Sequence, residues 1–388
     1  MIREELPFPG IIGRICHHPC EKACLRGEKV DDAVSLCALK RFVADYEVGK
    51  REIPVPVVRV RKEGRVAVVG GGPSGMTCAL YSRKAGYRVT IFESRDALGG
   101  MLSFGVPPFR LPPQVVEREV SLIEKAGIEV RYNTKIGRDV SLKEVRDTFD
   151  AVYIGCGAQA GARLGLENED APGVLSGIGF LGRAGEERKV GKRVIVVGGG
   201  NVAVDAALTA RMSGAQSVRI VCLERREEMA AGEHEVDRAG GAGVGLLAGW
   251  APQTILTGEG RVKGVQLVRC ASVFDGHGNF SPAYERKITK TIRGDTVIVA
   301  IGQAPETGFV GELPGLELTE GGWIRSDPAT PATTLPGVFA GGDVVAGPGM
   351  AVAAIADGKR AAARIDDYLS GEPSRPANAR TGGKRKGR

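Results

Sequence analysis

The sequence predicts an α/β fold with two Rossmann-like domains, one inserted in the other, after a short α-helical segment at the N-terminus. Two glycine-rich turns support this, at residues 70–75 and 198–203. Each follows a β-branched apolar run and opens into an apolar helix. Strand-like and helix-like segments alternate along most of the chain, which is typical of parallel sheets. Four cysteines lie in the first 37 residues, ahead of both turns.

Composition excludes several classes of protein. With 388 residues and 43% apolar side chains, the chain has room for two or three domains with ordinary cores. No apolar run approaches the roughly 20 residues that a membrane-spanning helix needs. The first residues contain no apolar signal region. We therefore expect a cytoplasmic protein with no membrane partner.

The formal net charge of +7 comes mostly from the end of the chain. Residues 371–388 are rich in lysine and arginine and poor in apolar side chains, so we expect a disordered basic tail that stays solvated. The rest of the chain is close to neutral, and a nucleic-acid partner is therefore not expected. Docking of the tail on an acidic partner is the alternative.

Hydrophobic periodicity and the positions of glycine and proline predict the order of the elements. Residues 1–50, which we call the cysteine segment, form short helices and are followed by a linker with Pro54 and Pro56. Residues 62–160 and 303–370 form one domain, and residues 161–302 form the domain inserted in it. In chain order we expect a helix at 38–45, a strand–turn–helix–strand unit over 65–93, a helix end and strand over 122–129, a strand at 151–154, a second such unit over 192–224, strands at 264–268 and 296–301, and a helix at 351–368.

In the first turn, residues 70–75, each glycine has a physical role. Gly70 permits the tight turn, Gly72 lets the backbone approach a pyrophosphate, and Gly75 lets the helix pack closely on the strand. Backbone N–H groups and the positive end of the helix bind the phosphates. Glu93 ends the next strand, where a carboxylate bonds a ribose hydroxyl; the alternative is a surface glutamate beside an ordinary turn. The predicted site residues here are Gly70, Gly72, Pro73, Ser74, Gly75 and Glu93.

Five further segments are distinctive: Gly99-Gly-Met-Leu102, Phe104-Gly-Val-Pro-Pro-Phe-Arg-Leu-Pro112, Gly155-Cys-Gly-Ala158, Ala300-Ile-Gly-Gln303 and Pro336-Gly-Val-Phe-Ala-Gly-Gly-Asp343. With these the chain resembles the glutamate synthase small-subunit family, from Pro7 to about Gly371. That family includes the flavin half of dihydropyrimidine dehydrogenase and NADH-dependent ferredoxin:NADP oxidoreductases. The resemblance implies that the first turn binds FAD, in a site that also contains Gly100, Met101, Leu102, Arg110, Gly157, Ala158, Gly302, Gly342 and Asp343.

Asp343 ends the last of these segments, just after a strand and two glycines. In related flavoproteins the matching aspartate bonds the ribityl or phosphate region of the flavin. The helix that begins near Met350 is expected to point its positive end at the isoalloxazine. The alternative, that Asp343 caps a helix, is compatible with this role.

The second turn, residues 198–203, has the nicotinamide form of the motif, because Ala203 replaces the third glycine. Asn201-Val-Ala-Val-Asp205 resembles the pyridine-nucleotide segment of the family, so we expect NAD(P)H here. The predicted site residues are Gly198, Gly200, Asn201, Val202, Ala203, Glu224, Arg225 and Arg226.

Glu224 favours NADH over NADPH. Family members that use NADPH commonly carry Tyr-Arg-Arg where this chain has Cys222-Leu223-Glu224. Two cations bind a 2′-phosphate, whereas a carboxylate repels it and bonds a free 2′-hydroxyl. Two alternatives stay open: Arg225 and Arg226 could still reach a phosphate, or Glu224 could pair locally with them.

The cysteines Cys16, Cys20, Cys24 and Cys37 have the short spacing of iron–sulfur ligands, and a [4Fe–4S] cluster takes four of them. Zinc is the alternative metal, with His17 and His18 nearby. The resembled family holds two [4Fe–4S] clusters, partly through cysteines further upstream, and many members have a cysteine where this chain has Ile12. We therefore expect at most one complete cluster from these residues. Two explanations stay open for the upstream cysteine stretch: it belongs to a separate polypeptide, or the start of the chain is misplaced.

Together these features predict a flavoprotein oxidoreductase. It takes a hydride from NAD(P)H, with NADH favoured, and passes single electrons through the iron–sulfur cluster to a partner subunit, as a glutamate synthase small subunit does. Transfer from NAD(P)H to ferredoxin is an alternative, and a non-catalytic flavin-bearing assembly subunit is an alternative of another class. No acid/base residue is assigned, because hydride transfer to a flavin does not require one. No Cys-x-x-Cys lies beside either turn, so the dithiol mechanism of thioredoxin reductases lacks its redox pair.

Overall fold

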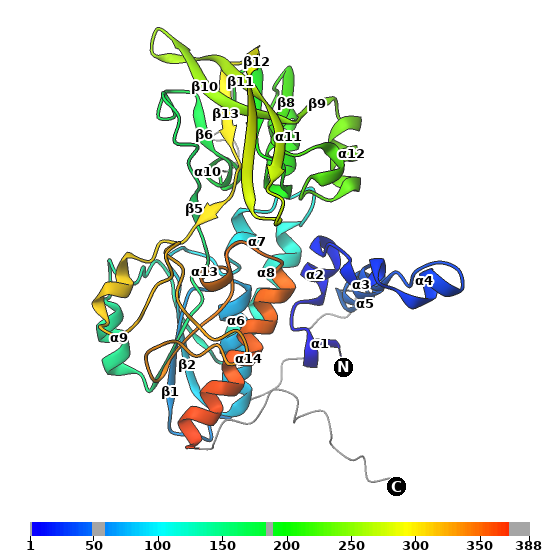
Figure 1. The fold of residues 1–388 in the computed structure, drawn as a ribbon. Coiled ribbons are helices and arrows are strands. Elements are labelled where there is room, and N and C mark those ends of the chain that lie inside the picture. The colour runs from blue at the N-terminus through cyan, green and yellow to red at the C-terminus, as the bar shows by residue number, and fades with distance from the viewer. Residues whose placement is uncertain (1, 49–58, 184–188, 372–388) are drawn as a thin grey trace. The chain divides into compact units, whose positions relative to one another are not determined.

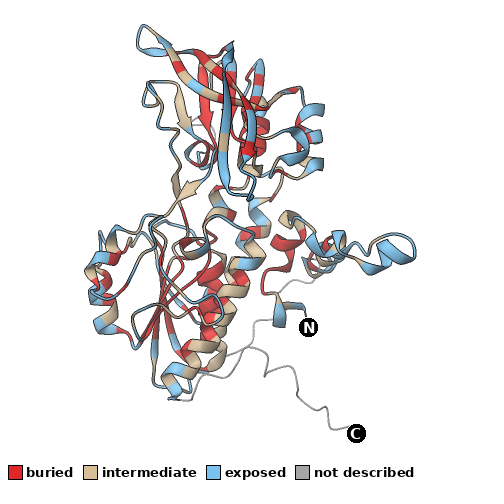
Figure 2. Ribbon diagram, viewed as in Figure 1, coloured by how far each residue is buried: buried red, intermediate tan, exposed pale blue. Residues whose placement is uncertain are grey.

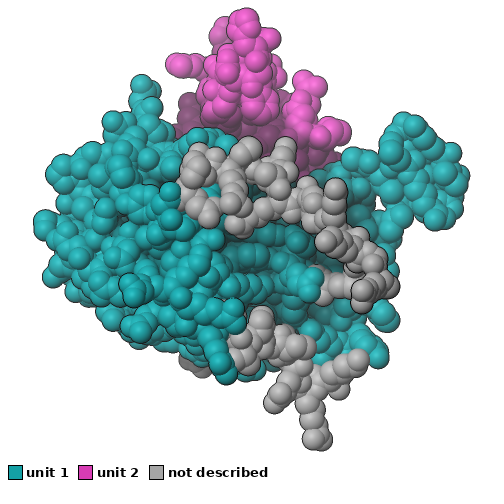
Figure 3. Space-filling view, turned by 90° about the horizontal axis from the view of Figure 1, so that it is seen from below, with its two compact units in different colours: residues 1–103, 108–158, 305–388 teal, residues 104–107, 159–304 magenta. Residues whose placement is uncertain are grey.

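The structure is a computed structural model that describes residues 2–48, 59–183 and 189–371 (Figure 1). The chain divides into two compact units (Figure 3): residues 1–103, 108–158 and 305–388 form unit 1, and residues 104–107 and 159–304 form unit 2. The predicted linker at Pro54 and Pro56 and the predicted tail after Gly371 lie outside the described residues. Both units contain a parallel sheet, which confirms the α/β class.

The sheet of unit 1 has the strand order β15-β4-β1-β2-β3 and is parallel throughout. The strands are β1 (Arg65–Val69), β2 (Arg88–Phe92), β3 (Glu129–Arg131), β4 (Ala151–Ile154) and β15 (Val338–Ala340). β1 and β4 are buried along almost their whole length (Figure 2), which is why they read as unbroken apolar runs. The chain continues from β1 to β2 on one side, while β4 lies on the other. The strand order therefore reverses at β1, the position where open α/β sheets bind their ligands.

Helices cover the sheet of unit 1: α6 (Pro73–Ala85), α8 (Pro113–Lys125), α9 (Leu142–Thr148) and α14 (Ala351–Ser370). α6 and α14 pack closely because Gly358 of α14 has no side chain. A Cβ atom at Gly358 would overlap the carbonyl oxygen of Ser74 and lie 2.9 Å from the backbone nitrogen of Cys78. The other face carries an apolar core that includes Phe92, Leu142 and Ile154.

The cysteine segment consists of short helices within unit 1, as the sequence predicts: α1 (Ile2–Glu5), α2 (Pro9–Ile15), α3 (Pro19–Lys22), α4 (Leu25–Lys29) and α5 (Leu36–Val48). α2 packs against α5 and α8 (Figure 1). Phe8, Ile11 and Ile12 are fully buried in this contact region. Along α4 and α5, by contrast, most side chains are exposed. The α2 helix is therefore the part of the segment that is anchored in the core.

Unit 2 contains a second parallel sheet, of order β6-β13-β7-β8-β9. Its strands are β6 (Val174–Ser176), β7 (Arg193–Val197), β8 (Ser217–Cys222), β9 (Val244–Ala248) and β13 (Thr296–Val299), and its helices are α10 (Gly177–Leu181), α11 (Asn201–Met212) and α12 (Glu233–Gly241). β7, the second turn and α11 repeat the arrangement of β1, the first turn and α6. Unit 2 also contains a separate antiparallel pair of short strands, β5 (Ala160–Gly161) and β14 (Gln303–Ala304).

An antiparallel sheet of β10 (Trp250–Gly258), β11 (Arg261–Phe274) and β12 (Phe280–Arg293) packs on one face of this parallel sheet. Val265 and Leu267 of β11 meet Ile195 and Val297 in the shared core. The sequence predicts only the central part of β11 and misses β12. β12 is exposed along most of its length and so lacks the alternation of apolar and polar residues that identifies a half-buried strand.

None of the helices in the described part of the chain has the length and apolar character needed to cross a membrane.

Gly358→Ala tests the close packing of α6 and α14. The added methyl group overlaps the Ser74 carbonyl, so α14 must move away from α6, and overpacking of this kind costs about 1–3 kcal/mol. We expect a thermal midpoint lowered by roughly 2–10 °C, measured by circular dichroism. Gly240→Ala in α12 is the control, because a methyl group there meets nothing within 4 Å. Equal midpoints for Gly358→Ala and the unmodified protein would contradict the packing described.

Candidate functional site

The first turn has the geometry of a pyrophosphate cradle. Gly70 has φ +99°, a conformation that L side chains rarely adopt. A Cβ atom at Gly75 would overlap the carbonyl oxygen of Gly70, so α6 begins in direct contact with β1. At Gly72, by contrast, an added Cβ would meet nothing within 4 Å. The backbone is thus closely packed at Gly70 and Gly75. It is open at Gly72, next to the start of the helix, which is where phosphate groups bind in such turns.

Glu93 lies directly over this turn and is buried, with 4% of its surface exposed. Its Oε2 accepts a hydrogen bond of 2.7 Å from the N–H of Gly71, and its Oε1 accepts one of 2.9 Å from the N–H of Arg95. A carboxylate held at the end of β2 by these two bonds is oriented to accept a further bond from a ribose hydroxyl. The alternative of a surface glutamate is wrong.

The predicted flavin segment folds onto the same turn. Gly99 donates its N–H to the carbonyl of Gly71 at 2.8 Å. Gly100 has φ +54°, and a Cβ atom there would lie 3.0 Å from the Cα of Gly72. Met101 and Leu102 open the short helix α7 (Met101–Phe104), with Leu102 buried. Arg110 is half-buried in the stretch between α7 and α8.

Gly342 and Asp343 reach this site from the C-terminal part of the chain. Gly342 has φ +75° and contacts Ser74: a Cβ atom on it would lie 3.0 Å from the Ser74 Cβ. The Gly342 N–H donates to Oδ2 of Asp357 at 2.9 Å. Asp343 begins the short helix α13 (Asp343–Ala346), and Met350 is the N-cap of α14.

Burial raises the pKa of Asp343 to about 6. The Gly349 N–H, which donates to its Oδ1 at 3.2 Å, acts in the opposite direction, and the Asp357 carboxylate adds a small further increase. Burial therefore favours the neutral, protonated form of this carboxyl.

Unit 1 thus brings together most of the residues predicted for FAD. Ser74 also pairs with the buried Tyr153, Oγ to hydroxyl, at 2.5 Å. Gly157 has φ +71° with open space beside it, and Ala158 is buried. Gly302 lies in unit 2, with φ +135°, between β13 and β14.

The second turn repeats this geometry with one change. Gly198 has φ +140°, and a Cβ atom there would overlap the carbonyl of Ala300, while Gly200 faces open space. Ala203 takes the place of the third glycine and is fully buried, 3.4 Å from where a Gly198 Cβ would lie. Asn201, the first residue of α11, accepts a hydrogen bond of 3.2 Å from Gly232 through Oδ1. Val202, beside it, is half-buried.

Glu224 occupies the position over the second turn that Glu93 occupies over the first. A Cβ atom at Gly199 would lie 2.5 Å from Oε2 of Glu224, and one at Gly71 would lie 2.9 Å from Oε2 of Glu93. The backbone carbonyl of Glu224 accepts from the N–H of Gly249 at 2.9 Å. In each unit, therefore, a carboxylate lies against the second glycine of the Gly-Gly-Gly run, which is Gly71 in the first turn and Gly199 in the second.

Arg225 and Arg226 lie among acidic groups. The backbone N–H of Arg225 donates to the Glu228 carboxylate at 3.0 Å, at the start of the 3₁₀ helix η2 (Arg226–Glu228). The Arg226 guanidinium forms an ion pair with Asp237 of α12. Both arginines are exposed, and Glu224 makes no ion pair with either among the contacts described for this part of the chain.

The predicted metal ligands differ in their surroundings. Cys20 is exposed and Cys16 and Cys24 are half-buried, whereas Cys37 is buried and its thiol donates to the carbonyl of Gly13 at 3.3 Å. Burial raises the pKa of Cys37. Backbone N–H groups of Val34, Gly27 and Arg26 lower the pKa of Cys24 and so favour its thiolate.

Thiolates that receive backbone N–H bonds suit an iron–sulfur cluster, so Cys24 fits such a ligand. Across residues 2–48, 59–183 and 189–371, no three cysteine, histidine or acidic side chains are arranged to hold a metal ion. The set Cys16, Cys20, Cys24 and Cys37 stays a prediction. His17 is exposed, and the half-buried His18 lies with its Nδ1 3.2 Å from the Glu21 carboxylate.

Sequence reasoning missed residues that act through their neighbours. Gly71 and Gly199 fill variable positions of the glycine motif, yet each is the contact point of an acidic residue. Both belong to an uninterrupted Gly-Gly-Gly run, a signal that could have identified them. Tyr153 bonds Ser74 at the first turn and Asp357 bonds Gly342 beside it, and only the fold brings these residues together.

The chain matches two described sequence families. Residues 64–358 match the family described as pyridine nucleotide-disulphide oxidoreductase. Residues 1–52 match the one described as dihydropyrimidine dehydrogenase domain II, 4Fe-4S cluster. The first match contains both turns and the second contains the four N-terminal cysteines. They confirm the expected cofactors: FAD, NAD(P) and a [4Fe–4S] cluster.

Among characterised relatives, the chain is 38% identical to the NADP(+)-dependent formate dehydrogenase subunit beta of Moorella thermoacetica, over 95% of this chain and 56% of that protein. It is 37% identical to the NADPH-Fe(3+) oxidoreductase subunit beta of Geobacter sulfurreducens, over 95% and 59%. It is 34% identical to the glutamate synthase [NADPH] small chain of Escherichia coli, over 93% and 81%. The chain thus spans less than two thirds of the first two relatives and most of the third.

Two solved structures share the fold. FprA of Mycobacterium tuberculosis, in complex with NADPH, has a TM-score of 0.68 at 19% identity, over 80% of this chain and 85% of that one. Thioredoxin reductase of T. acidophilum has a TM-score of 0.58 at 22% identity, over 79% and 99%. These likenesses support the two Rossmann-like units.

Glu93→Gln tests the first turn. The amide group of glutamine must point its NH₂ at one of two N–H donors, Gly71 or Arg95, and it is a poorer acceptor for the ribose. We expect the Kd for FAD to rise about tenfold or more, measured by fluorescence titration of the FAD-free protein. Glu320→Gln, on an exposed side chain, is the control. An unchanged Kd would show that Glu93 does not contribute to the FAD site.

Asp343 makes stability depend on pH in the FAD-free protein. Its pKa in the folded state lies above the ordinary value of 3.8. Its stabilising contribution to the free energy of unfolding is therefore fully present below pH 3.8 and is lost as the pH rises through about 6. Asp343→Asn removes this dependence. Relative to the unmodified protein, the variant is expected to gain up to about 3 kcal/mol in unfolding free energy across that interval, measured by urea unfolding. Parallel pH profiles would contradict the raised pKa.

Proposed function

We propose a function from the premise that this chain belongs to the pyridine nucleotide-disulphide oxidoreductase family, in the group that contains glutamate synthase small chains. It takes a hydride from NADH at the second turn and delivers the electrons singly to a protein partner by way of the cysteine segment. The first turn holds FAD.

The observation that carries the choice of NADH is the position of Glu224. Its carboxylate is set against Gly199 as the Glu93 carboxylate is set against Gly71 in the turn assigned to FAD, whose ribose has free hydroxyl groups. A carboxylate in this position accepts a hydrogen bond from a 2′-hydroxyl and repels a 2′-phosphate. The names of three relatives specify NADP or NADPH, so this chain is proposed to differ from them in its preferred nucleotide.

The arginines after Glu224 lie among other acidic groups. The Arg226 guanidinium is paired with Asp237, and the backbone N–H of Arg225 donates to the Glu228 carboxylate. A 2′-phosphate would bring additional negative charge into a group of carboxylates. NADH lacks that charge and needs only the acceptor that Glu224 provides.

The residues of the chain bind and orient the cofactors. When bound, FAD accepts a hydride and gives up electrons singly, and a [4Fe–4S] cluster carries single electrons. The starts of α6 and α11 supply N–H donors and a positive helix end for the phosphates. The start of α14, capped by Met350, supplies a second positive end close to Asp343 in sequence. Cys16, Cys20 and Cys24, with Cys37 as the fourth ligand, are proposed to hold the cluster.

A partner protein is proposed as the final acceptor. The relatives are named as a subunit beta, in two cases, and as a small chain. Cys20 is exposed and Cys16 and Cys24 are half-buried, so electrons can leave from the surface of the cysteine segment. A ferredoxin is the second candidate acceptor, and the exposed Cys20 supports it equally.

Steady-state kinetics test the nucleotide preference. With an artificial acceptor, we expect kcat/KM to be about tenfold or more higher for NADH than for NADPH, since one charge-assisted hydrogen bond is worth about 1.5–3 kcal/mol. Glu224→Ser removes the carboxylate and is expected to bring the two values within about threefold by lowering kcat/KM for NADH and raising it for NADPH.

Glu227→Gln is the matched control, because it removes an exposed charge from the next turn of the chain and should leave the preference unchanged. A higher kcat/KM for NADPH in the unmodified protein would overturn the choice of NADH. Failure of both nucleotides to bleach the flavin would instead favour the non-catalytic assembly subunit.

A further inference from the structure

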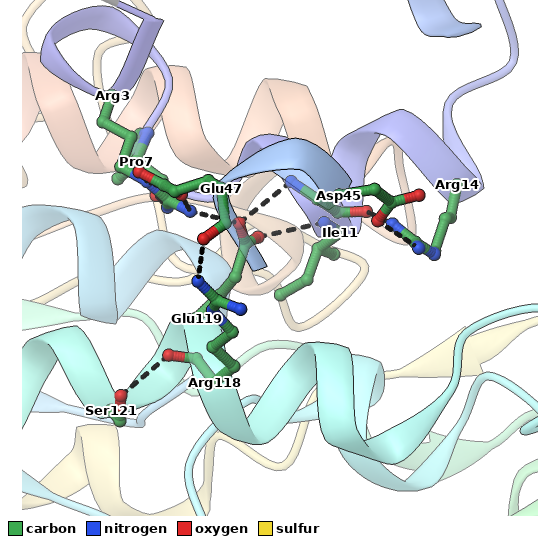
Figure 4. Close-up of polar contacts among 10 residues, drawn as sticks. Arg3, Pro7, Ile11, Arg14, Asp45, Glu47, Arg118, Glu119 and Ser121 are labelled. Carbon is green, nitrogen blue, oxygen red and sulfur yellow. Dashed lines mark hydrogen bonds and ion pairs between the residues drawn. The ribbon is translucent and has the colours of Figure 1, made fainter. Parts of the chain in front are cut away.

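A polar network joins the cysteine segment to α8 of the FAD-binding sheet (Figure 4). Its centre is Glu119, whose side chain is only 3% exposed. Oε1 of Glu119 accepts from the Gly10 N–H at 2.9 Å and from Arg3 Nη2 at 3.0 Å, and Oε2 accepts from the Ile11 N–H at 2.9 Å. Each of these three partners of Glu119 is a hydrogen-bond donor, as a carboxylate requires.

Glu119 does for α2 what a capping side chain normally does. The N-cap of α2, Phe8, makes no side-chain cap, and Pro9 at the first helical position has no N–H. Gly10 and Ile11 follow, and their N–H groups have no acceptor within the helix. A carboxylate from another helix satisfies both, and its negative charge suits the positive end of α2.

Arg118, the residue before Glu119 in α8, caps the C-terminal end of α5. Its Nη2 donates to the backbone carbonyl of Glu47 at 2.7 Å, in the last turn of α5. A cation suits the negative C-terminal end of a helix. Two consecutive residues of α8 therefore cap two helices of the cysteine segment, each with the charge that the helix end favours.

Arg3 connects the two caps. Its guanidinium donates to the Glu47 carboxylate, with Nε 3.0 Å from Oε2, and to Glu119 (Figure 4). Its third partner is the carbonyl of Pro7, at 2.8 Å. The ion pair of Arg14 with Asp45, at 2.6 Å, joins α2 to α5 independently.

The position of α2 determines where two of the cysteines lie. Cys16 is the C-cap of α2, and the Cys37 thiol donates to the carbonyl of Gly13 in the same helix. Burial of Glu119 raises its pKa, against the opposing effects of Arg3 and the two N–H groups. Such a buried group stabilises the contact only while its donors are in place, and removing its charge leaves those donors unsatisfied.

We propose that Arg118 and Glu119 are positioning residues: they fix the cysteine segment on α8 and so set the path by which electrons leave the flavin. The second half of this inference rests on the proposed function. Overall, NADH is oxidised to NAD⁺ and one proton, two one-electron acceptors are reduced, and no covalent bond in the protein forms or breaks.

Hydrogen exchange tests the anchoring without reference to any cofactor. In Glu119→Gln the glutamine NH₂ faces a donor N–H, so the amides of Gly10 and Ile11 are expected to exchange about tenfold faster or more. Arg118→Met should speed exchange in the last turn of α5 and leave Gly10 and Ile11 protected. Glu117→Gln, on an exposed position of the same helix, should change neither.

Rapid-mixing kinetics on the protein loaded with FAD and cluster test the electron path. In Glu119→Gln we expect the rate of flavin bleaching by NADH and the KM for NADH to stay within about twofold. The rate at which the cluster is reduced, followed by EPR on freeze-quenched samples, should fall about tenfold or more. Arg118→Met should show the same split, and it serves as the second variant should Glu119→Gln not fold.

Each outcome decides a different point. Unchanged exchange at Gly10 and Ile11 in Glu119→Gln would overturn the anchoring role. An equal loss in bleaching and in cluster reduction would overturn the positioning role, because it would indicate general damage to the fold. If the unmodified protein fails to reduce its cluster with NADH, the proposed function fails, while the exchange measurement still decides the role of Glu119.

Discussion

The structure of unit 1 depends on the close approach of backbone to backbone at positions where no side chain intervenes. Gly75 lies against the carbonyl of Gly70, and Gly358 lies against the carbonyl of Ser74. The first contact sets the start of α6 on the end of β1, and the second sets α14 on α6. Because Gly75 and Ser74 both lie at the start of α6, a Cβ atom at Gly75 or at Gly358 would displace the backbone of the first turn as well as the core.

An acidic residue also follows the second strand in each of the two units. Glu93 and Glu224 each face the middle glycine of a turn, and both therefore suit a ribose with free hydroxyl groups. Ala203 in place of a third glycine shows that the second helix approaches its strand less closely than the first. The two turns thus share one physical arrangement and differ in how closely the helix packs on the strand.

Patterns local in sequence predicted the parts of the molecule that depend on local physics. Both turns, their strands and helices, and Glu93 follow from β-branched runs, glycine spacing and one acidic residue. Contacts between distant segments were not predictable in this way: Tyr153 with Ser74, Asp357 with Gly342, and Glu119 with α2 join residues far apart in the chain. β12 was missed for a different reason, since an exposed strand carries no apolar period.

The proposed function requires NADH to reduce FAD on this chain by direct hydride transfer. Anaerobic rapid mixing of the FAD-loaded protein with NADH, and with NADH deuterated at the transferred C4 position, tests it most directly. We expect NADH to bleach the flavin absorbance and deuteration to slow the bleaching, because the C4–H bond breaks in that step. If NADH leaves the flavin oxidised over the same interval, direct hydride transfer does not occur on this chain.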